Sequence, residues 1–418
     1  MRKYKLGDIA TVEISGVDKK IKDGEKEIRL CNFVDVYYNW AITTAQHDSF
    51  MLATARPNEI SKFKLKKGQV ALTKDSETRD DIGIPTYIAD DFDDAILGYH
   101  CALVTPNKDI LDGRYLNALL HTDYAEKYFA CNASGSGQRY ALSVEALNSF
   151  PVPIIPLHEQ KQIGEIFSAL DKKIELNKRI NQNLEAMAKQ LYDYWFVQFD
   201  FPNEEGKPYK SSGGEMLWNE KLKRKIPVGW HCGNLFEIAV FTNGLACQKF
   251  RPKDNEVPLP VIKIREMHDG ISVDTEKVTS NIPESVKVYN GDVLFSWSAS
   301  LEVMLWAYGL GGLNQHIFKV TSANDFPKSF YYFQLLDYVD VFKKMAEARK
   351  TTMGHITQDH LQQSTIAIPD NKDIADKFEE LISPIFKQIV KLQEEISNLI
   401  KQRDELLPLL MNGQITIE

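Results

Sequence analysis

The chain has 418 residues, of which 43% are hydrophobic and 26% are charged, values that are ordinary for a soluble globular protein with two or three domains. Its formal net charge of −8 speaks mildly against a nucleic-acid partner, although local basic patches decide whether phosphates are bound. The sequence has neither a signal-peptide run nor a membrane-spanning apolar stretch, so we expect a cytoplasmic protein that has no membrane partner.

The first 150 residues mix strand and helix signals. Strand-like runs lie at residues 70–73 and 99–104, and apolar spacing predicts one helix from Arg114 over RYLNALLHTDYAEKYFA. A glycine-serine turn follows at 133–137, then a short helix around 144–147. The extended run 150–156 carries prolines, which exclude a central position in a sheet.

The same order of signals returns in the second half. LGDIA at Leu6 returns as LFEIA at Leu235, and the strand signal KKGQVAL returns as YNGDVLF. Strand runs near 261–264 and 293–296, a helix over 328–348, a turn containing Gly354, a short helix near Leu361 and an extended run at 366–369 follow. We therefore expect two similar α+β domains, each with a mixed sheet, related by a pseudo-two-fold axis. Such a molecule suits a bipartite partner.

Each half ends in helical sequence. In the first half a short helix (158–170) leads to Asp171, a good N-cap, and then to a long helix reaching about residue 197. In the second half we expect Ser383 as the N-cap, Pro384 at the first helical position and Pro408 at the stop. Apolar residues step by three and four along narrow seams: Ile174, Asn177, Ile180, Leu184, Met187, Leu191 and Tyr194 in the first, and Ile385, Ile389, Leu392, Ile396, Leu399, Arg403, Leu406 and Leu410 in the second.

These seams predict an antiparallel coiled coil in which the polar Asn177 fixes the register. The alternative is that each helix only covers its own domain. Between the halves, residues 202–230 are polar, lysine-rich and punctuated by glycine and proline, which predicts a surface linker.

The sequence offers no convergent catalytic set. It contains no Walker-type phosphate loop, no glycine-rich nucleotide turn and no histidine pair at metal-binding spacing. Five scattered cysteines indicate reduced thiols and not a disulfide frame or zinc site. Asp200 with Glu205 and Lys207 has the spacing of a metal-dependent nuclease, but it lies in the expected linker. We therefore propose no catalytic residue and no metal ligand.

At this point the arrangement resembles the specificity subunit of type I restriction–modification systems. The resemblance covers nearly the whole chain. It depends most on the run from Val152, VPIIPLHEQKQIGEIFSALDKKIELNKRINQNLEAMAKQLYDYWF, on FPNEEGKPYKSSGGEMLW from Phe201, and on NGDVLFS and LNQHIFKV in the second copy. The first copy departs from this pattern, with GYHCALV in place of NQHIFKV.

The resemblance implies two target recognition domains, each reading one part of a split site in double-stranded DNA. The implied division is a first target recognition domain at 1–156, a spacer helix region at 157–200, a linker at 201–230, a second target recognition domain at 231–370 and a second spacer helix region at 371–418. The helices would set the gap between the half-sites and dock two methyltransferase subunits. By the same resemblance, this chain has no cofactor of its own, the methyltransferase subunits carry S-adenosylmethionine and modify adenine, and motor-nuclease subunits use ATP and Mg²⁺.

Candidate DNA contacts are polar or basic residues at strand ends and in the two loops that follow the helices, ASGSGQRY and ARKTTMGH, which hold equivalent places in the repeat. They are Lys74, Ser76, Thr78, Arg79, Gln138 and Arg139 in the first half, and Lys249, Arg251, Lys263, Arg265, Arg349, Lys350, Thr351, Thr352 and His355 in the second. The alternative for any one of them is a solvated surface side chain.

An aromatic and aliphatic set near the end of the first long helix is a candidate docking surface for a methyltransferase: Leu184, Met187, Leu191, Tyr194, Trp195, Phe196 and Phe199. The alternative is that this set packs onto the start of the second domain. Two other functions also stay open at this stage. One is a self-contained restriction enzyme or DNA methyltransferase, and the other is a coiled-coil scaffold without sequence specificity.

Overall fold

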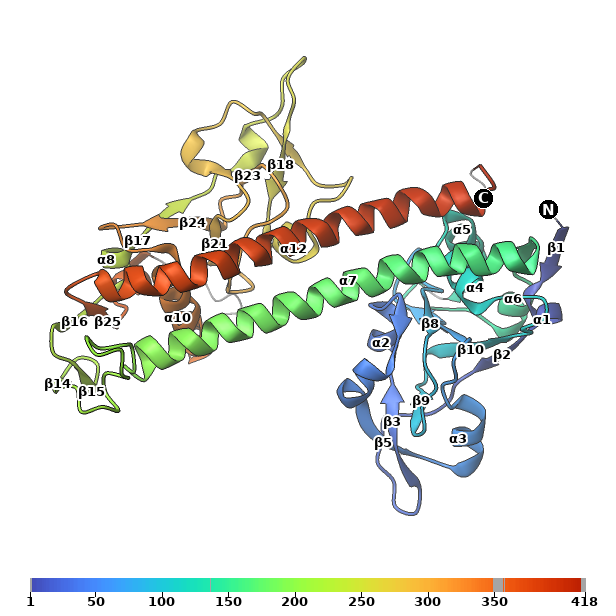
Figure 1. The fold of residues 1–418 in the computed structure, drawn as a ribbon. Coiled ribbons are helices and arrows are strands. Elements are labelled where there is room, and N and C mark those ends of the chain that lie inside the picture. Colours follow the sequence, from blue (N-terminus) through green and yellow to red (C-terminus); the bar gives the residue numbers. More distant parts are fainter. Residues whose placement is uncertain (1, 136, 349–355, 357, 415–418) are drawn as a thin grey trace. The chain divides into compact units, whose positions relative to one another are not determined.

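The computed structural model describes residues 2–135, 137–348, 356 and 358–414. The chain forms two compact units (Figure 1): unit 1 is Met1–Glu175 with Leu399–Glu418, and unit 2 is Leu176–Asn398. Each of the two long helices, α7 (Leu157–Tyr192) and α12 (Asp373–Met411), therefore contributes residues to both units.

Unit 1 is built on a five-stranded sheet in the order β2-β10-β6-β8-β4. Its strands are β2 (Ala10–Ile14), β10 (Cys101–Pro106), β6 (Val70–Thr73), β8 (Pro85–Ile88) and β4 (Ala41–Ile42), and only the β4–β8 pair is parallel. A second sheet, β5 (Met51–Ala55), β3 (Lys26–Cys31) and β9 (Ala95–Leu97), has β3 and β9 parallel. Strands β1 (Arg2–Lys5) and β13 (Pro151–Ile154) form a separate antiparallel pair, which explains how the prolines of β13 are tolerated.

The helix expected from Arg114 is two helices, α4 (Gly113–Leu120) and α5 (Asp123–Asn132). Thr122 breaks it, because its backbone is extended and serves as the N-cap of α5. The α4 helix starts at Asp112, whose carboxylate accepts hydrogen bonds from the N–H groups of Arg114 and Tyr115. Helix α4 is almost wholly buried and belongs to the same core as the sheet residues Val70 and Val104.

Unit 2 repeats this plan. Its main sheet has the order β17-β24-β21-β22, with strands β17 (Ala239–Asn243), β24 (Ile317–Ser322), β21 (Val293–Ser296) and β22 (Glu302–Leu305). A second sheet has the order β19-β18-β23-β20, with β19 (Lys277–Val278), β18 (Leu259–Ile262), β23 (Gly311–Leu313) and β20 (Lys287–Val288). The β18–β23 pair is parallel like β3–β9, and β16 (Trp230–Gly233) pairs with β25 (Ile366–Pro369) as β1 pairs with β13. The expected internal repeat is therefore a repeat of topology.

The remaining elements are not matched one for one between the units. In unit 1 they are α1 (Leu6–Ile9), α2 (Phe33–Tyr37), the 3-10 helix Thr44–Ser49, α3 (Pro57–Phe63), β7 (Asp75–Ser76), β11 (Ser134–Gly135), β12 (Tyr140–Ala141) and α6 (Val144–Asn148). In unit 2 they are α8 (Leu235–Ile238), the 3-10 helices Cys247–Lys249 and Glu284–Val286, α9 (Ile264–Asp269), α10 (Lys328–Ala348) and α11 (Gln358–Gln362). Helices α10, α6 and α11 lie where the sequence predicts them.

Both long helices are continuous where the sequence predicts caps. Asp171 lies inside α7, and Pro384 and Pro408 lie inside α12, so the expected breaks at Asp171, Ser383 and Pro408 are wrong. A proline inside a helix costs about 3 kcal/mol because it removes a hydrogen bond and crowds the preceding turn. The exposed Pro384 is flanked by the buried Ile382 and Phe386, and burial of such apolar side chains offsets that cost.

The helices pair antiparallel within each unit, as predicted. In unit 2 the Asn181 side-chain amide donates to the carbonyl of Ile389, and Tyr192 lies against Phe378. In unit 1 Phe167 near the start of α7 shares a core with Leu407 near the end of α12. Residue numbers thus increase along one helix where they decrease along the other, as in an antiparallel pair.

The seam of α7 differs from the expected one after Asn177. The buried positions are Ile174, Asn177, Asn181, Ala188 and Tyr192, whereas Met187 is 59% exposed. A seam whose residues step by three or four can be assigned to either of two adjacent positions at each turn. Packing against the partner helix decides which of the two positions is buried.

The expected surface linker is more ordered than its composition suggests. After a short π-helical turn (Asp193–Val197), residues 216–227 form a hairpin of β14 (Met216–Asn219) and β15 (Arg224–Pro227). Trp230 is buried and its ring lies 5.3 Å from that of Phe199 and 5.7 Å from that of Phe201. Aromatic packing therefore fixes this segment within unit 2.

Candidate nucleic-acid interface

Unit 1 has a hollow of about 490 Å³ at the strand ends next to the glycine-serine loop. It is lined by Phe33, Asp75, Ser76, Glu77, Thr78, Asp81, His100, Gln138 and Arg139. Four residues predicted from the sequence, Ser76, Thr78, Gln138 and Arg139, thus meet at one place although their two segments are far apart in the chain. The small sheet β11-β12-β7 brings them together, since Tyr140 pairs with Ser76 and Ala141 with Asp75.

Asp75 is the centre of this hollow. Its carboxylate binds Nζ of Lys74 at 2.9 Å, contacts Nδ1 of His100 and lies 3.3 Å from Nη2 of Arg139. Partial burial works to raise the pKa of Asp75, but the hydrogen bonds from Lys74 and His100 outweigh it and hold that pKa below its usual value. Asp75 therefore stays ionised and orients the three donor groups around it.

The predicted residues of unit 1 differ in how accessible their side chains are. Arg139 and Gln138 are exposed, so their donor groups are accessible to a ligand. Lys74 is half-buried, and its ammonium is held by Asp75 at 2.9 Å. The Arg79 guanidinium lies over the Tyr140 ring, 5.0 Å from its centroid, which fixes this arginine at the edge of the hollow.

Several members of this site were missed in the sequence. Asp75, His100 and Asp81 were not singled out, nor was Tyr37, which donates from its hydroxyl to Asp81 at 2.8 Å and stacks on Phe33. One signal was available for His100, because GYHCALV and NQHIFKV share a histidine before the central strand of each half. His100 also has a left-handed backbone (φ 72°), which is uncommon outside glycine and often marks a functional site.

Unit 2 reproduces the backbone of this site. The N–H of Lys74 donates to the carbonyl of His100, and the N–H of Trp297 donates to that of His316. The N–H of Leu142 then donates to the carbonyl of Lys74, as the N–H of Ile356 does to the carbonyl of Trp297. Leu142 and Ile356 each follow one of the two loops that the sequence paired, so the segments after these loops return to equivalent strand ends.

The side chains at this place in unit 2 are different. The Trp297 indole N–H donates to Asn243 at 3.3 Å, and the Trp297 ring lies 5.5 Å from that of His316. Gln315 lies beside them, with its side-chain nitrogen 3.2 Å from Nε2 of His316. One backbone frame thus carries a charged set in unit 1 and an aromatic and amide set in unit 2, which is what two readers of different sequences need.

The other candidates of unit 2 divide into three groups. Lys249 and Arg251 are exposed. Lys263 is paired with Glu276 at 2.5 Å and Arg265 with Glu266 at 2.7 Å, so both cations are already neutralised within the fold. A third group, Arg349, Lys350, Thr351, Thr352 and His355, lies outside the described residues.

The candidate docking set is split by the fold. Trp195, Phe196 and Phe199 are buried in the core of unit 2, where Phe196 packs on Phe330 and Phe378. These three rings therefore stabilise the fold, in agreement with the alternative that they pack onto the second domain. Leu184 and Leu191 are partly buried against the same core, whereas Met187 and Tyr194 are exposed. Met187 and Tyr194 are therefore the members of the set that a partner could reach.

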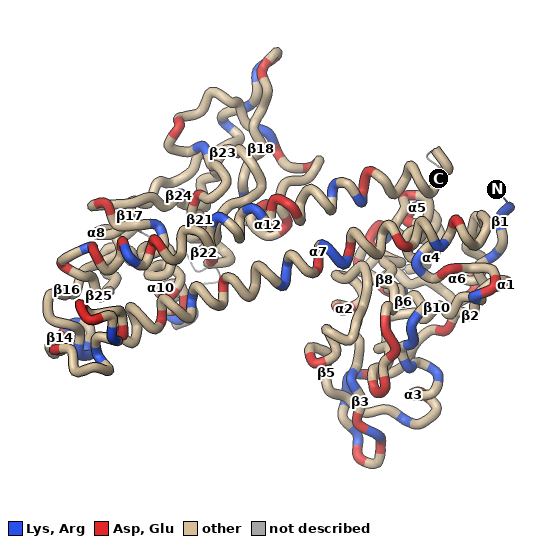
Figure 2. Tube along the Cα trace, viewed as in Figure 1, with Lys and Arg blue, Asp and Glu red and all other residues tan. Residues whose placement is uncertain are grey.

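Charged side chains outside the hollow form no concentrated patch on the described residues of the long helices (Figure 2). Basic and acidic residues are interspersed along α7 and α12 (Figure 2), as on solvated helix faces. Asp200 accepts hydrogen bonds from the backbone N–H and the hydroxyl of Ser211, a structural role in place of a nuclease site. Within the described residues no group of histidine, cysteine and carboxylate side chains is arranged to hold a metal, and no helix has the length and apolar character to cross a membrane.

Comparisons with known proteins agree on one family. The model of the type I restriction modification DNA specificity domain matches residues 1–186 and 227–402. The MjaIX type I restriction enzyme specificity subunit of Methanocaldococcus jannaschii is 25% identical over 320 residues, which are 74% of this chain and 71% of that protein. The HindI specificity subunit of Haemophilus influenzae is 23% identical over 415 residues, 85% of this chain and 88% of that protein.

A crystal structure has the same fold. The S subunit of a type I restriction–modification system from M. genitalium superimposes with a TM-score of 0.58 and 13% identity, covering 98% of this chain and 95% of that one. At this identity the likeness concerns the fold alone.

Proposed function

This chain belongs to the family of type I restriction–modification DNA specificity domains, and we propose that it is the non-catalytic subunit that selects the DNA sequence for a methylation and restriction complex. Unit 1 reads one half of a bipartite site and unit 2 reads the other. The observation that carries this proposal is the shared frame at His100 and His316, where each unit places different side chains on the same backbone.

Each unit would use its strand ends and loop as a reading surface. Gln138 and Arg139 offer the side-chain donors that suit base edges in the major groove, where arginine favours guanine and glutamine favours adenine. Asp75 would orient Arg139 without contacting DNA. Exposed Lys249 and Arg251 in unit 2 suit phosphate contacts, which position a protein on DNA without reading sequence.

The helices would set the gap between the half-sites. Helix α7 has 36 residues, which corresponds to about 54 Å of helix, compared with about 34–36 Å for one turn of B-DNA. The exposed Met187 and Tyr194 would help to dock the methyltransferase subunits, of which we propose two, one for each half-site.

The partners would supply the chemistry in the cytoplasm, where the host DNA lies. Methyltransferase subunits would carry S-adenosylmethionine and modify adenine, and motor-nuclease subunits would carry ATP and Mg²⁺. The chain itself would bind no cofactor.

The test is to map methylated adenines in host DNA with and without this chain. We expect one bipartite methylated sequence that disappears when the chain is deleted and returns when it is restored. Substitutions confined to unit 1 should change only one half of that sequence. Methylation or cleavage by the purified chain alone would instead identify a self-contained enzyme, and equal affinity for all duplexes would identify a scaffold.

A further inference from the structure

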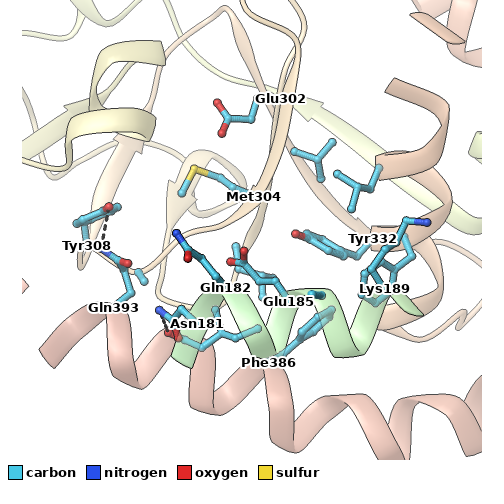
Figure 3. Close-up of a pocket in the computed structure, with 17 residues that line it drawn as sticks. Asn181, Gln182, Glu185, Lys189, Glu302, Met304, Tyr308, Tyr332, Phe386 and Gln393 are labelled. Carbon is cyan, nitrogen blue, oxygen red and sulfur yellow. Dashed lines mark hydrogen bonds between the residues drawn. The ribbon is translucent and has the colours of Figure 1, made fainter. Parts of the chain in front are cut away.

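Unit 2 holds a cavity of about 590 Å³ that the proposed reading of DNA does not use (Figure 3). It opens where α7 and α12 meet α10 and β22. Its apolar walls are Val303, Leu305, Phe333, Leu336, Phe386 and Ile389. Its volume is in the range of about 300–1,000 Å³ that is typical of small-molecule sites.

Three side-chain donors around this cavity are already engaged. The side-chain N–H of Asn181 donates to the carbonyl of Ile389 at 3.3 Å, and that of Gln393 donates to the Tyr308 hydroxyl at 3.0 Å. The Lys189 ammonium is neutralised by Asp193 and by Asp337, the latter at 2.9 Å. The Gln182 amide and the Tyr332 hydroxyl also line the cavity, so acceptors and two further donors stay available to a ligand.

Two residues that line the cavity each have a buried acceptor without a hydrogen-bond donor among the described residues. Asn181 is only 7% exposed, and its Oδ1 accepts nothing. The Glu302 side chain is 37% exposed, but its Oε2 is buried and accepts no hydrogen bond; Nε2 of His268 lies 3.2 Å away and forms an ion pair with it when the imidazole is protonated. A buried acceptor without a donor is costly, so these two atoms point to a missing donor.

A second carboxylate adds negative charge on the α7 side. Glu185 lines the cavity and makes no hydrogen bond or ion pair with the described residues. Glu185 is exposed, and partial desolvation raises the pKa of its carboxyl. Glu185 on α7 and Glu302 on β22 come from different walls, and Met304 lies between them in the view of Figure 3.

We propose that this cavity binds an aliphatic diamine or a longer polyamine. One ammonium group would bind between Glu185 and Oδ1 of Asn181, and the other would bind Glu302. The methylene chain between them would lie over Met304 and the Tyr332 ring. Each ammonium group of the ligand meets a carboxylate, and its methylene chain meets apolar side chains. Both chemical parts of the ligand therefore have a complementary part of the cavity wall.

Titration of the full-length chain with putrescine and spermidine by calorimetry tests this proposal without DNA. We expect saturable binding of both amines, weaker binding of butylamine, and none of MgCl₂ at matched ionic strength. Glu185→Gln and Glu302→Gln should each weaken putrescine binding by about ten-fold, because each removes one charge-assisted contact. The control Glu380→Gln changes an exposed glutamate of α12 outside the cavity and should leave binding unchanged.

The site itself is checked by ¹³C-methyl methionine NMR. Putrescine should shift the Met304 methyl resonance, assigned with Met304→Leu, and should not shift it in a Glu185→Gln/Glu302→Gln variant that has the wild-type circular dichroism. An unmoved Met304 signal, or equal binding by the Glu380→Gln and double variants, would overturn the proposal and would indicate nonspecific attraction to an acidic chain.

Discussion

The guanidinium of Arg403 lies over the indole of Trp40, 4.8 Å from the ring centroid. The ring of His121 is stacked on the same indole at 4.0 Å and 8°, and the ring of Phe167 lies 5.8 Å from it. A residue near the end of the chain thus completes the first unit, together with Leu407 and Leu410 in its core. The C-terminal helix is therefore part of the unit that the N-terminus begins.

Arg403→Ala should destabilise unit 1. The side chain is only 20% exposed, so its loss removes a cation–π contact of about 1 kcal/mol together with the packing of its aliphatic stem. Calorimetry should show a lower melting temperature for the transition of unit 1. Lys401→Ala, at a position 74% exposed, is the matched control and should change little. Equal melting of both variants would contradict this role for Arg403.

His121 should make unit 1 sensitive to acid. Burial, with a smaller contribution from the Arg403 charge, lowers the pKa of His121 to about 3. In the unfolded chain this group titrates near 6.5, so between about pH 6.5 and 3 the unfolded state binds the extra proton. The free energy of unfolding should thus fall with decreasing pH, by about 2 kcal/mol at pH 5.

The measurement is the melting temperature of unit 1 as a function of pH. His121→Phe preserves a ring that can stack on Trp40 and removes the proton-binding site. It should flatten the dependence between pH 7 and 5, and an unchanged slope would assign the acid sensitivity to other groups.

Arg139→Ala should weaken binding to the cognate duplex by about 1–3 kcal/mol if it reads a base, and the loss should be confined to one half-site. Gln138→Ala should relax the sequence preference at a neighbouring base. Fluorescence anisotropy against a panel of duplexes with single substitutions gives both results. Lys127→Ala, at a position of unit 1 that is 79% exposed, is the control. Uniform loss across the panel would make Arg139 a phosphate contact.

One heptad added to both long helices should change the gap of the recognised site. Seven residues lengthen a helix by about 10.5 Å, close to 3 base pairs of B-DNA. The insertions belong after Glu175 in α7 and after Asn398 in α12, where the two units divide. Methylation mapping should then find the same half-sites about 3 base pairs further apart. The same gap after insertion would refute spacing by the helices.

Asn177→Leu should stabilise the helix pair. Asn177 is 1% exposed, and neither atom of its amide group has a hydrogen-bond partner among the described residues. Replacing such a group with an apolar side chain of similar size removes a penalty of about 1–3 kcal/mol. Thermal unfolding should show a higher melting temperature, with Lys178→Leu on the exposed side of α7 as the control. A lower melting temperature for Asn177→Leu would mean that its amide is satisfied in solution.

The sequence by itself determined the repeat, the strands β6, β10, β13, β18, β21 and β25, the two long helices and their pairing. These are local or periodic features, because the apolar pattern of a strand or helix depends on residues that are close together in the sequence. It also paired the two loops that follow the helices, because the same elements precede and follow them in each half.

Only the tertiary structure decided which residues act together. It showed that Thr122 divides one expected helix, that the second long helix neither begins at Pro384 nor ends at Pro408, and that Met187 lies off the seam while Ala188 lies on it. It also joined Asp75 and His100 to Arg139 and buried Trp195 in a core instead of a docking surface. Each of these outcomes depends on a contact between segments far apart in the chain, and such contacts override local preference because burial free energy exceeds the differences in propensity.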